Sequence, residues 1–494
     1  MVKKLKKIFL LLMLFAALFL VSFFLFGFVS AIDYYASPNG SSSGSGTLQN
    51  PWNLQTGLIN THAGDTLYVL PGTITNADFT ISNSGTSENH RVVVQAYDPN
   101  NKPVFIGSNN SVTQVLSING DYVTVKNFII IGNASGRRNI RIKGNYVTLD
   151  GIESYYIAPG TSSSNHNINA YSAKNLIIRN SLVDRSPRNG IYLISSYPNG
   201  SADNCLIENT EIRNVTAHHP INIFPNTGDT TVLPIKGCII RNNYIHDGDG
   251  QSAFFVRNFE DFQIYNNVII NMGNGLSISS GNYGQDVYDA NGSFTNNIVV
   301  VNNGHGVIDW TANYLTIKNN IFYGTFYNNQ VLRFEENYLD VDSDGVPIIG
   351  HDINNNIYYN ISGQLRFDWG PNTYTGLVAW QSATGQDANS IHADPLFTDI
   401  VHGLLSANSS AVDNGVSVLG YNTDYYGHVR NGIWDIGAYE IGATGDGSYH
   451  PADLNQNGCV ELGEISVYVG LWLNNQGVSL SEASSAVSIW LGGC

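Results

Sequence analysis

One short phrase recurs along most of this chain, an alternating apolar strand followed by one or two asparagines and a second apolar pair. It reads VTVKNFII, LIIRNSLV, CLIENTEI, CIIRNNYI, FQIYNNVI, GSFTNNIV, LTIKNNIF and HDINNNIY. Successive copies lie roughly 23 to 36 residues apart and carry short strands without helical periodicity. A unit of that length buries its apolar face only by stacking on its neighbours. The phrase therefore predicts a parallel β-solenoid in which each copy belongs to one coil.

The asparagine of each phrase predicts a second feature of the solenoid. Asparagine tolerates the left-handed backbone conformation of a sharp corner, and stacked asparagine side chains can hydrogen-bond from coil to coil. We therefore expect one inward ladder with a structural role. Its members would be Asn127, Asn180, Asn209, Asn242, Asn266, Asn296, Asn319 and Asn355, with Gly151 filling one gap.

The two open ends of a solenoid must be covered. Residues 51–60 (PWNLQTGLIN) indicate a short helix with a proline near its start. A second helical stretch covers residues 374–383, and residues 435–440 (DIGAYE) predict a closing strand. The strand-rich body thus extends over residues 32–441.

The boundaries of this body resemble a known family. Its opening (YYASPNG, NPW and AGDTLYVLPGTI) and its ending (ADPLF, AVDNG and DIGAYE) are similar to those of the secreted right-handed β-helix proteins of the pectate-lyase-like superfamily, over about residues 33–441. The resemblance implies an all-β, right-handed parallel β-helix. Enzymes of that family include pectate, alginate and chondroitin lyases and polygalacturonases, and many relatives have no established activity. These motifs specify the fold and not the chemistry.

The first 31 residues predict export. Four lysines precede an apolar run from Ile8 to Val29, and the small residues Ser30 and Ala31 follow. This segment is either a cleaved signal peptide or a membrane anchor that stays attached, and in both cases the lysines place the rest of the chain outside. We therefore expect a secreted or cell-surface protein, with a membrane as partner only if the segment is uncleaved.

Net charge argues against nucleic acid as a partner. Without the four lysines of the first segment, 19 basic residues remain against 39 acidic ones, a net charge of −20. A strongly acidic protein is repelled by a phosphate backbone. The family resemblance points to a polysaccharide instead.

Basic residues nevertheless gather at one place on the predicted solenoid. When each coil is aligned from its asparagine, one column contains Arg138, His166, Asn189, His219, Ser252, Asn274, His305 and Gln330. Adjacent strands lie about 4.8 Å apart, so Arg188, His219 and Arg257 on three successive coils would span roughly 10 Å. A cationic patch on an acidic protein predicts an acidic ligand, for which a uronate polysaccharide is the natural choice.

Cleavage of a uronate polymer by β-elimination needs two kinds of group. A base takes the proton alpha to the carboxyl group, and a cation neutralises the carboxylate. His219 or Lys143 would be the base, and Arg188 or Arg257 the cation. The substrate-binding side chains expected beside them are His218, Gln251, Tyr171, Phe224 and Trp310. The alternative is that all of these are scattered turn residues.

Glycoside hydrolysis is not expected. Polygalacturonase-like members carry a D-D pair followed by G-H-G and R-I-K, whereas here the R-I-K sequence (residues 141–143) precedes the G-H-G sequence (residues 304–306) and no D-D pair is present. We therefore expect G-H-G to be a structural bend. Two function classes remain: a polysaccharide-degrading enzyme, most plausibly a lyase, and a non-catalytic surface, envelope or adhesion protein that binds glycans.

The C-terminal residues 451–494, which follow a linker at residues 442–450, predict a calcium-binding helical module. The run DLNQNGCVELGE has the spacing of an EF-hand loop. Its ligands would be Asp453, Asn455, Asn457, Cys459, Glu461 and Glu464. The module resembles half of a dockerin repeat, which implies a surface or scaffold partner.

A second calcium loop is less complete. Asp340, Asp342 and Asp344 alternate before a glycine, but His351 stands where the closing glutamate is expected, so a simple polar turn is an equal alternative. The four cysteines of an exported chain can form disulfides. A Cys459–Cys494 bridge is predicted, while Cys205 and Cys238 either form a bridge or stack as small buried residues.

Overall fold

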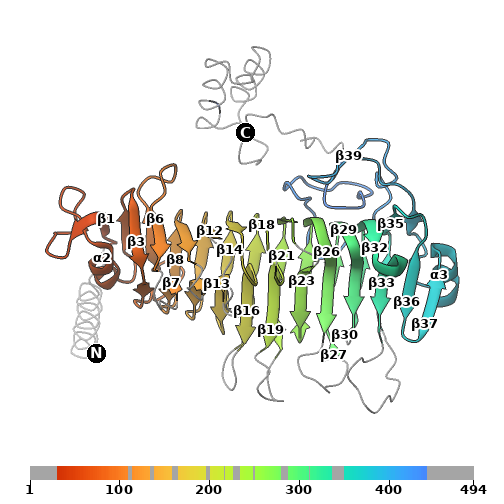
Figure 1. The fold of residues 1–494 in the computed structure, drawn as a ribbon, viewed down its shortest axis with the longest axis horizontal. Helices are drawn as coiled ribbons and strands as arrows, with labels where there is room; N and C mark the ends of the chain where they lie inside the picture. Colours follow the sequence, from red (N-terminus) through yellow and green to blue (C-terminus); the bar gives the residue numbers. More distant parts are fainter. Residues whose placement is uncertain are drawn as a thin grey trace, which may run out of the picture.

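The fold is that of a computed structural model, which describes residues 31–108, 114–133, 138–157, 165–195, 201–215, 217–225, 234–248, 251–279, 288–310, 312–335, 350–441 and residue 465. It confirms the predicted right-handed parallel β-helix (Figure 1). A typical coil consists of three strands. The first belongs to the twelve-stranded sheet, and the second and third belong to two further columns of parallel strands, which we call the second and third stacks. The coils follow one another along the long axis of the molecule.

The first sheet contains twelve strands. They are β1 (Asp33–Ser41), β2 (Thr66–Val69), β5 (Val92–Ala96), β8 (Val123–Lys126), β11 (Thr148–Asp150), β14 (Ile177–Arg179), β17 (Leu206–Glu208), β21 (Ile239–Arg241), β25 (Gln263–Tyr265), β28 (Ser293–Thr295), β31 (Thr316–Lys318) and β34 (Asp352–Asn354).

The second and third stacks are joined by two long strands, β26 (Val268–Ser279) and β29 (Ile298–Asp309), which bend from one stack into the other. The second stack also contains β3 (Thr73–Ala77), β6 (Val104–Gly107), β9 (Ile129–Gly132), β12 (Glu153–Tyr156), β15 (Leu182–Asp184), β18 (Glu211–Arg213), β22 (Tyr244–His246), β32 (Ile321–Phe326), β35 (Ile357–Asn360) and β38 (Ile391–His392). The third contains β4 (Phe79–Ile81), β7 (Gln114–Ile118), β10 (Arg138–Ile142), β13 (His166–Tyr171), β16 (Ile191–Ser195), β19 (Ile221–Pro225), β23 (Ser252–Arg257), β33 (Gln330–Phe334) and β36 (Arg366–Trp369).

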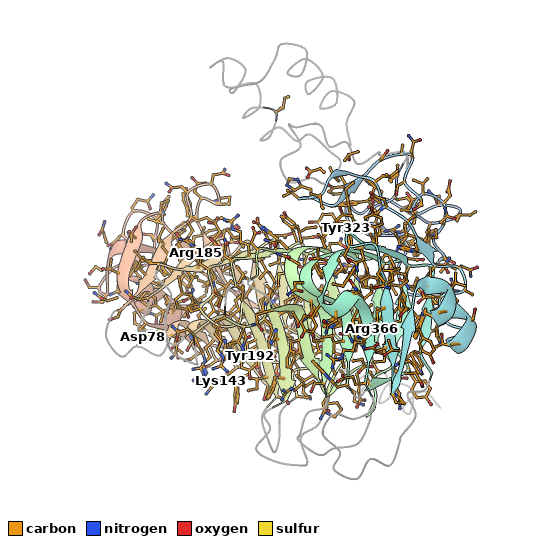
Figure 2. All side chains as sticks on the ribbon, turned by 45° about the vertical axis from the view of Figure 1, so that its right-hand side comes forward. Asp78, Lys143, Arg185, Tyr192, Tyr323 and Arg366 are labelled. Atoms are coloured by element: carbon orange, nitrogen blue, oxygen red, sulfur yellow. A yellow bond between two sulfur atoms is a disulfide. The ribbon has the colours of Figure 1, made fainter. Side chains whose placement is uncertain are left out.

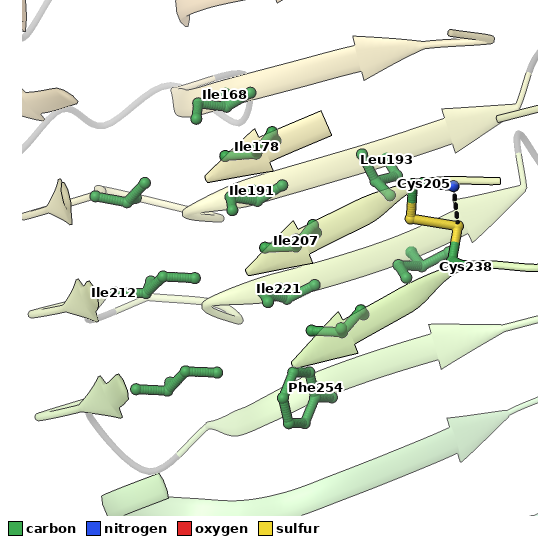
Figure 3. Close-up of a cluster of buried hydrophobic side chains, with 14 of the residues drawn as sticks. Ile168, Ile178, Ile191, Leu193, Cys205, Ile207, Ile212, Ile221, Cys238 and Phe254 are labelled. Carbon is green, nitrogen blue, oxygen red and sulfur yellow. Dashed lines mark hydrogen bonds between the residues drawn. A yellow bond between two sulfur atoms is a disulfide. The ribbon is translucent and has the colours of Figure 1, made fainter. Parts of the chain in front are cut away.

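The interior is filled by columns of aliphatic and aromatic side chains (Figure 3). In the third stack Ile168, Ile191, Ile221 and Phe254 follow one another in register and are fully buried. Burying one such side chain contributes about 1.5–3 kcal/mol, so the core stabilises every coil. The alternation of a strand then directs the intervening residues outward, which is where a ligand can reach them.

Most strands of the first sheet lie between two corner residues with positive φ. The corners before the strands are Tyr122, Tyr146, Asn175, Asn204, Gly237, Asp261, Asn291, Tyr314 and Gly350, and those after them are Asn127, Gly151, Asn180, Asn209, Asn242, Asn266, Asn296, Asn319 and Asn355. The asparagines of the repeated phrase therefore take the left-handed corner conformation that the sequence predicts.

The prediction that these corner asparagines form the inward ladder is wrong by one residue. The ladder belongs to the next position, where Asn243, Asn267, Asn297, Asn320 and Asn356 are fully buried. In the first four, Nδ2 donates to the Oδ1 of the asparagine on the following coil at 2.9–3.1 Å, and the Nδ2 of Asn356 donates to the Asp387 Oδ1 at 3.2 Å. The left-handed residue lies on the outside of the corner, so the alternation turns its successor inward.

Several corner asparagines instead bind residues 394–441, which we call the C-terminal cover. The Asn266 Nδ2 donates to the Thr423 carbonyl at 2.7 Å, and the Asn319 Nδ2 donates to the Val416 carbonyl at 2.7 Å. The C-terminal cover packs over outward apolar side chains of the second stack, such as Ile298. Its short strands β39 (Phe397–Asp399) and β40 (Leu404–Leu405) pair with each other.

The closing strand predicted at residues 435–440 is wrong. That segment is irregular and belongs to the C-terminal cover. Its Glu440 pairs with the buried Arg430 at 2.8 Å, and Arg430 also donates to the Gly437 carbonyl. These side-chain contacts satisfy the backbone where a strand ladder would otherwise be needed.

Both helical predictions are confirmed. Helix α2 (Leu54–Asn60) packs on β1 and β4 near the N-terminal coils, and α3 (Leu377–Thr384) follows β37 (Asn372–Thr375), which pairs antiparallel with β36. A Cys205–Cys238 disulfide joins neighbouring coils and decides between the two alternatives for these residues (Figure 3). Among the described residues, no helix is long and apolar enough to cross a membrane.

Several predictions lie outside the described residues. These are the export segment before residue 31, the calcium loop at residues 453–464, the Cys459–Cys494 bridge, and the acidic run with Asp340, Asp342 and Asp344. His351, which follows that run, is described. Its side chain is buried, and its Nδ1 accepts the backbone N–H of Leu315 at 3.0 Å, so this nitrogen already has a structural partner.

Candidate functional site

The third stack is basic on its outward face over five consecutive strands, from β10 to β23. We call this surface, with the bends before β16 and β19, the basic face. It comprises Arg138, Arg141, Lys143, His166, Tyr171, Arg188, Tyr192, His218, His219, Asn222, Phe224, Phe255 and Arg257. Lys143 and Tyr192 lie along one side of the solenoid, whereas Arg185 of the second stack lies along the other (Figure 2).

Strand register decides the order of residues along the basic face. Arg138 pairs with His166 on the next strand, and further along the same column Ser252 pairs with Asn274 and Asn274 with His305. The pairing of β16 with β19 and of β19 with β23 places Arg188, His219 and Arg257 on three successive coils. The structure therefore brings these three predicted residues together on one face.

A central row passes through Tyr192, Asn222 and Phe255, which pair in that order. Asn222 lies between the two aromatic positions and is 7% exposed. Its Nδ2 donates to the Asn189 Oδ1 at 3.2 Å, while its Oδ1 has no hydrogen-bond partner within the described chain. A buried acceptor of this kind is suited to a hydroxyl donor from a ligand.

Aromatic contacts orient the cation and the imidazole beside this row. The Arg257 guanidinium lies 4.7 Å from the Phe224 ring centroid and 5.2 Å from that of Phe255. The His219 ring stacks on Phe255 with centroids 4.4 Å apart and planes at 9°. Such contacts restrict both side chains to one orientation.

The imidazole of His219 is neutral, and its hydrogen bond shows which ring nitrogen carries the proton. Its Nδ1 lies 3.3 Å from the Ser252 carbonyl, which only accepts, so Nδ1 carries the proton and Nε2 keeps its lone pair. Burial, together with the neighbouring His218, lowers the pKa of His219 to about 4. At neutral pH the Nε2 is therefore an available proton acceptor.

His166 and Tyr192 form a second polar pair. Their rings lie 4.7 Å apart, and His166 is 3% exposed. Burial lowers the pKa of His166 to about 3, and the cations Arg188 and Arg138 act in the same direction. Burial raises the pKa of Tyr192, against an opposing effect of Arg188, so Tyr192 carries its proton at neutral pH.

The other predicted residues lie at the margins of the basic face. Arg141 lies 6.0 Å from the Tyr171 ring, and Lys143 is exposed at the end of β10, away from His219. The Gln251 carbonyl accepts two backbone N–H groups of the next coil, at residues 273 and 274. Trp310 lies two coils beyond Arg257, since residue 279 stands between them in register.

The G-H-G sequence is structural. His305 is 6% exposed, with its Nδ1 3.1 Å from the Asn274 Oδ1 and its Nε2 3.3 Å from the Gln330 Oε1. A Cβ added at Gly304 would lie 1.2 Å from the Gly273 carbonyl oxygen, so only glycine allows this bend of β29. This arrangement confirms the prediction of a bend.

Sequence analysis did not propose Tyr192, Asn222 or Phe255 as site residues. They occupy the central outward position of their strands, three residues beyond the bend column of Asn189, His219 and Ser252. The same alignment extended by three residues places them in one row. His166 belongs to the aligned column, but the sequence does not indicate a role for it, because its burial beside arginines arises only in the folded chain.

A metal ion has no evident site in this part of the molecule. Within the described ranges, no three or more His, Cys, Asp or Glu side chains are grouped to hold a metal ion. The basic face relies instead on guanidinium, imidazole, phenol and amide groups. Groups of these kinds can bind anions and transfer protons.

Comparison with known proteins identifies the fold. No protein-family model matches the chain, and no curated protein matches its sequence. Pectate lyase Pel9A is similar in structure, with 15% identity and a TM-score of 0.53, over 84% of this chain and 97% of that chain. An alginate lyase from Paenibacillus sp. str. FPU-7 gives 20% identity and a TM-score of 0.45, over 63% of this chain and 99% of that one. A rhamnogalacturonan lyase gives 15% identity and a TM-score of 0.41, over 74% and 90%. At these identities the likeness shows the β-helix fold alone.

Proposed function

We propose that this protein binds an acidic polysaccharide on the basic face and cleaves it by β-elimination. The observation that carries the proposal is the geometry of His219, whose Nδ1 lies 3.3 Å from the Ser252 carbonyl and whose ring stacks on Phe255, the ring that the Arg257 guanidinium also contacts. This arrangement sets a proton acceptor beside a cation that can bind an anionic ligand. The fold shared with Pel9A, which is named a pectate lyase, supports the same class of substrate.

The proposed reaction uses three kinds of group. Arg188, with Arg138 and Arg257 nearby, holds the uronate carboxylate and stabilises the negative charge that develops beside it. The Nε2 of His219 takes the proton alpha to the carboxyl group as that C–H bond breaks. The electron pair forms the new double bond, and the bond from the β carbon to the glycosidic oxygen breaks.

The leaving oxygen needs a proton, and Tyr192 is the proposed donor. Its hydroxyl is protonated at neutral pH, and it lies one strand from His219 in the central row. Asn222 between them offers an acceptor oxygen to a sugar hydroxyl. Proton exchange with water then restores His219 and Tyr192 for the next cycle.

The test is incubation of the protein with uronate and neutral polysaccharides while both unsaturated product absorbance and new reducing ends are followed. We expect unsaturated products from a uronate polymer and none from a neutral one. Reducing ends without absorbance would replace the lyase by a hydrolase. Binding without either product would support the non-catalytic surface protein instead.

Export and calcium binding are part of the same proposal, and residue spacing supports them. Residues 1–31 have the composition of an export segment, and Asp453 to Glu464 have that of a calcium loop. Chelation of the full-length protein is expected to reduce its helical circular dichroism while the β signal persists. An unchanged spectrum with and without calcium would contradict the calcium assignment.

A further inference from the structure

Two tyrosines occupy corners of the first sheet where small residues are expected. Strand register places Tyr122 beside Tyr146, and Tyr146 beside Asn175 on the next coil. The tyrosines have φ angles of 51° and 55°. A bulky side chain rarely adopts this left-handed conformation, which asparagine and glycine tolerate. The corners that follow in the same column are Asn175, Asn204 and Gly237, as this preference predicts.

A third left-handed tyrosine in this column has a structural reason. Tyr314 has a φ of 56°, and a Cβ added at Gly350 on the next coil would overlap the Tyr314 ring. The ring therefore lies over a corner that has no side chain of its own. The corner after Tyr146 is Asn175 instead, and its Oδ1 accepts the Nδ2 of Asn204 at 3.3 Å.

The rings of Tyr122 and Tyr146 form a short aromatic column along the solenoid axis. Their centroids lie 4.3 Å apart with the planes at 6°, and both residues are partly exposed. The stack ends at the coil of β14, because the side chain of Asn175 is shorter than that of tyrosine. A flat ring placed over Asn175 would continue the stack at about the strand spacing of 4.8 Å. The apolar face of a pyranose ring can pack on an aromatic ring in this way.

Polar groups beside this position can contact sugar hydroxyls. Lys174 and Asp203 directly precede the corners of their coils, and the Lys174 Nζ lies 3.8 Å from the Asp203 Oδ2. Both side chains are partly exposed, at 48% and 24%. A carboxylate accepts and an ammonium group donates, so the two together can bind neighbouring hydroxyls of one ring.

Charge around the tyrosines is balanced, in contrast to the basic face. The pair of Lys174 with Asp203 has no net charge, and Arg91 pairs with Glu88 at 2.8 Å. The exposed Lys143 precedes Tyr146 by three residues, and Asp121 directly precedes Tyr122. These charges do not favour a uronate carboxylate over an uncharged sugar.

We infer that Tyr122 and Tyr146 form a second, non-catalytic carbohydrate site, which binds a neutral pyranose ring of a polysaccharide. The ring stacks on Tyr146, and the pair of Lys174 with Asp203 contacts its hydroxyls. This site goes beyond the proposed cleavage on the basic face and does not depend on it. Binding then accounts for two bulky side chains at left-handed corners, since backbone strain of this kind gathers at functional sites.

Affinity electrophoresis of the full-length protein tests the inference. The gels contain one of three neutral soluble polymers, hydroxyethylcellulose, arabinoxylan or galactomannan. We expect at least one polymer to retard the parent protein, and the double variant Tyr122→Asn with Tyr146→Asn to weaken that binding about fivefold or more. Because asparagine favours the left-handed corner, the midpoint of thermal unfolding of this variant should stay within about 2 °C of the parent's.

Tyr314→Asn is the matched control, because it makes the same substitution at a left-handed corner of the same column. It should leave the retardation unchanged. In gels that contain polygalacturonate, the double variant should migrate like the parent, since the basic face is intact. The inference is overturned if none of the neutral polymers retards the parent, if the double variant is retarded as strongly as the parent, or if Tyr314→Asn or the polygalacturonate gel shows an equal loss. The formation of unsaturated products tests the proposed function separately.

Discussion

Two outward faces of one solenoid carry cations in opposite ways. On the first sheet, one row passes through Lys126, Asp150, Arg179, Glu208 and Arg241, so that each charge stands in register beside its opposite. We call this row the paired row. Arg179 approaches Asp150 to 3.0 Å, and Arg241 approaches Glu208 to 2.7 Å.

The basic face has no such alternation of sign. There burial lowers the pKa of His166, and the neighbouring cations Arg188 and Arg138 lower it as well. In a parallel solenoid each outward residue stands directly over its equivalent on the next coil, so the sequence of charges along a column decides whether the column neutralises itself. The paired row neutralises its charges internally, whereas on the basic face the strand register places Arg138 beside His166.

His219→Ala should produce the largest difference between the two faces. If His219 is the base, kcat should fall by about 10²–10⁴, the usual contribution of a positioned base, while affinity changes little. Turnover is measured from unsaturated product absorbance. His402→Ala, at a side chain that is 60% exposed on the C-terminal cover, is the control and should retain the parent kcat. An unchanged rate in His219→Ala would assign the base elsewhere.

The second expected effect is on the pH at which kcat/KM falls in acid, because protonation of His219 removes the proposed base. Because the pKa of His219 is lowered from 6.5 to about 4, most of its imidazole remains neutral at pH 5. The neutral fraction of an ordinary histidine with a pKa of about 6.5 would fall about 25-fold between pH 7 and pH 5. The pH dependence of kcat/KM for the free enzyme checks this expectation, and an acid limb near pH 6.5 would contradict it.

The free energy of unfolding in acid should reflect the burial of His166 beside cations. Its pKa is lowered in the folded state to about 3, so the unfolded chain binds this proton more readily. The associated stability is present above pH 6.5 and is lost as pH falls toward 3, by about 2 kcal/mol at pH 5. His166→Gln should remove that part of the acid dependence in urea unfolding at pH 7 and pH 5. An identical pH dependence in parent and variant would refute it.

Arg188→Ala should weaken binding of an acidic oligosaccharide about tenfold, since a charge-assisted contact contributes roughly 1.5–3 kcal/mol. Higher salt should weaken binding by the parent in the same direction. Calorimetric titration measures both effects. Arg241→Ala in the paired row removes the same charge and should leave affinity unchanged. Equal losses would mean that net charge alone attracts the ligand.

The smallest expected effect is on the paired row itself. Arg241→Ala removes the partly exposed cation that pairs with the buried Glu208 and should lower the free energy of unfolding by about 1 kcal/mol. Replacement of both residues, in the double variant Arg241→Ala with Glu208→Ala, should recover part of that loss. A double variant as unstable as the sum of the two single ones would show that the pair contributes nothing.

The sequence by itself determined the stacking of coils and the order of residues along a column. Repeat length and the left-handed tendency of asparagine are local properties, so the corners at Asn127 to Asn355 and the column from Arg138 to Gln330 follow from the printed residues. The same alignment places Arg188, His219 and Arg257 on neighbouring coils.

Only the tertiary structure decided which residue of each Asn-Asn pair faces inward. A strand alternates its side chains with a period of two, so a shift of one residue at the corner exchanges inside and outside. The sequence pattern does not show which of the two residues faces inward. In the folded chain the ladder runs through Asn243 and Asn297 and not through Asn242 and Asn296. The corner asparagines anchor the C-terminal cover through contacts between residues 59 to 157 positions apart, which only the folded chain brings together.

Charge compensation was likewise decided by contacts between coils. Arg241 and Arg188 are equivalent in sequence as isolated cations in strand-rich repeats, and only the neighbour one coil away distinguishes them. Glu208 stands beside Arg241, whereas Arg188 acts on the buried rings of His166 and Tyr192. Burial and the charge of a neighbouring coil set a pKa, and both arise from packing between residues that are distant along the chain.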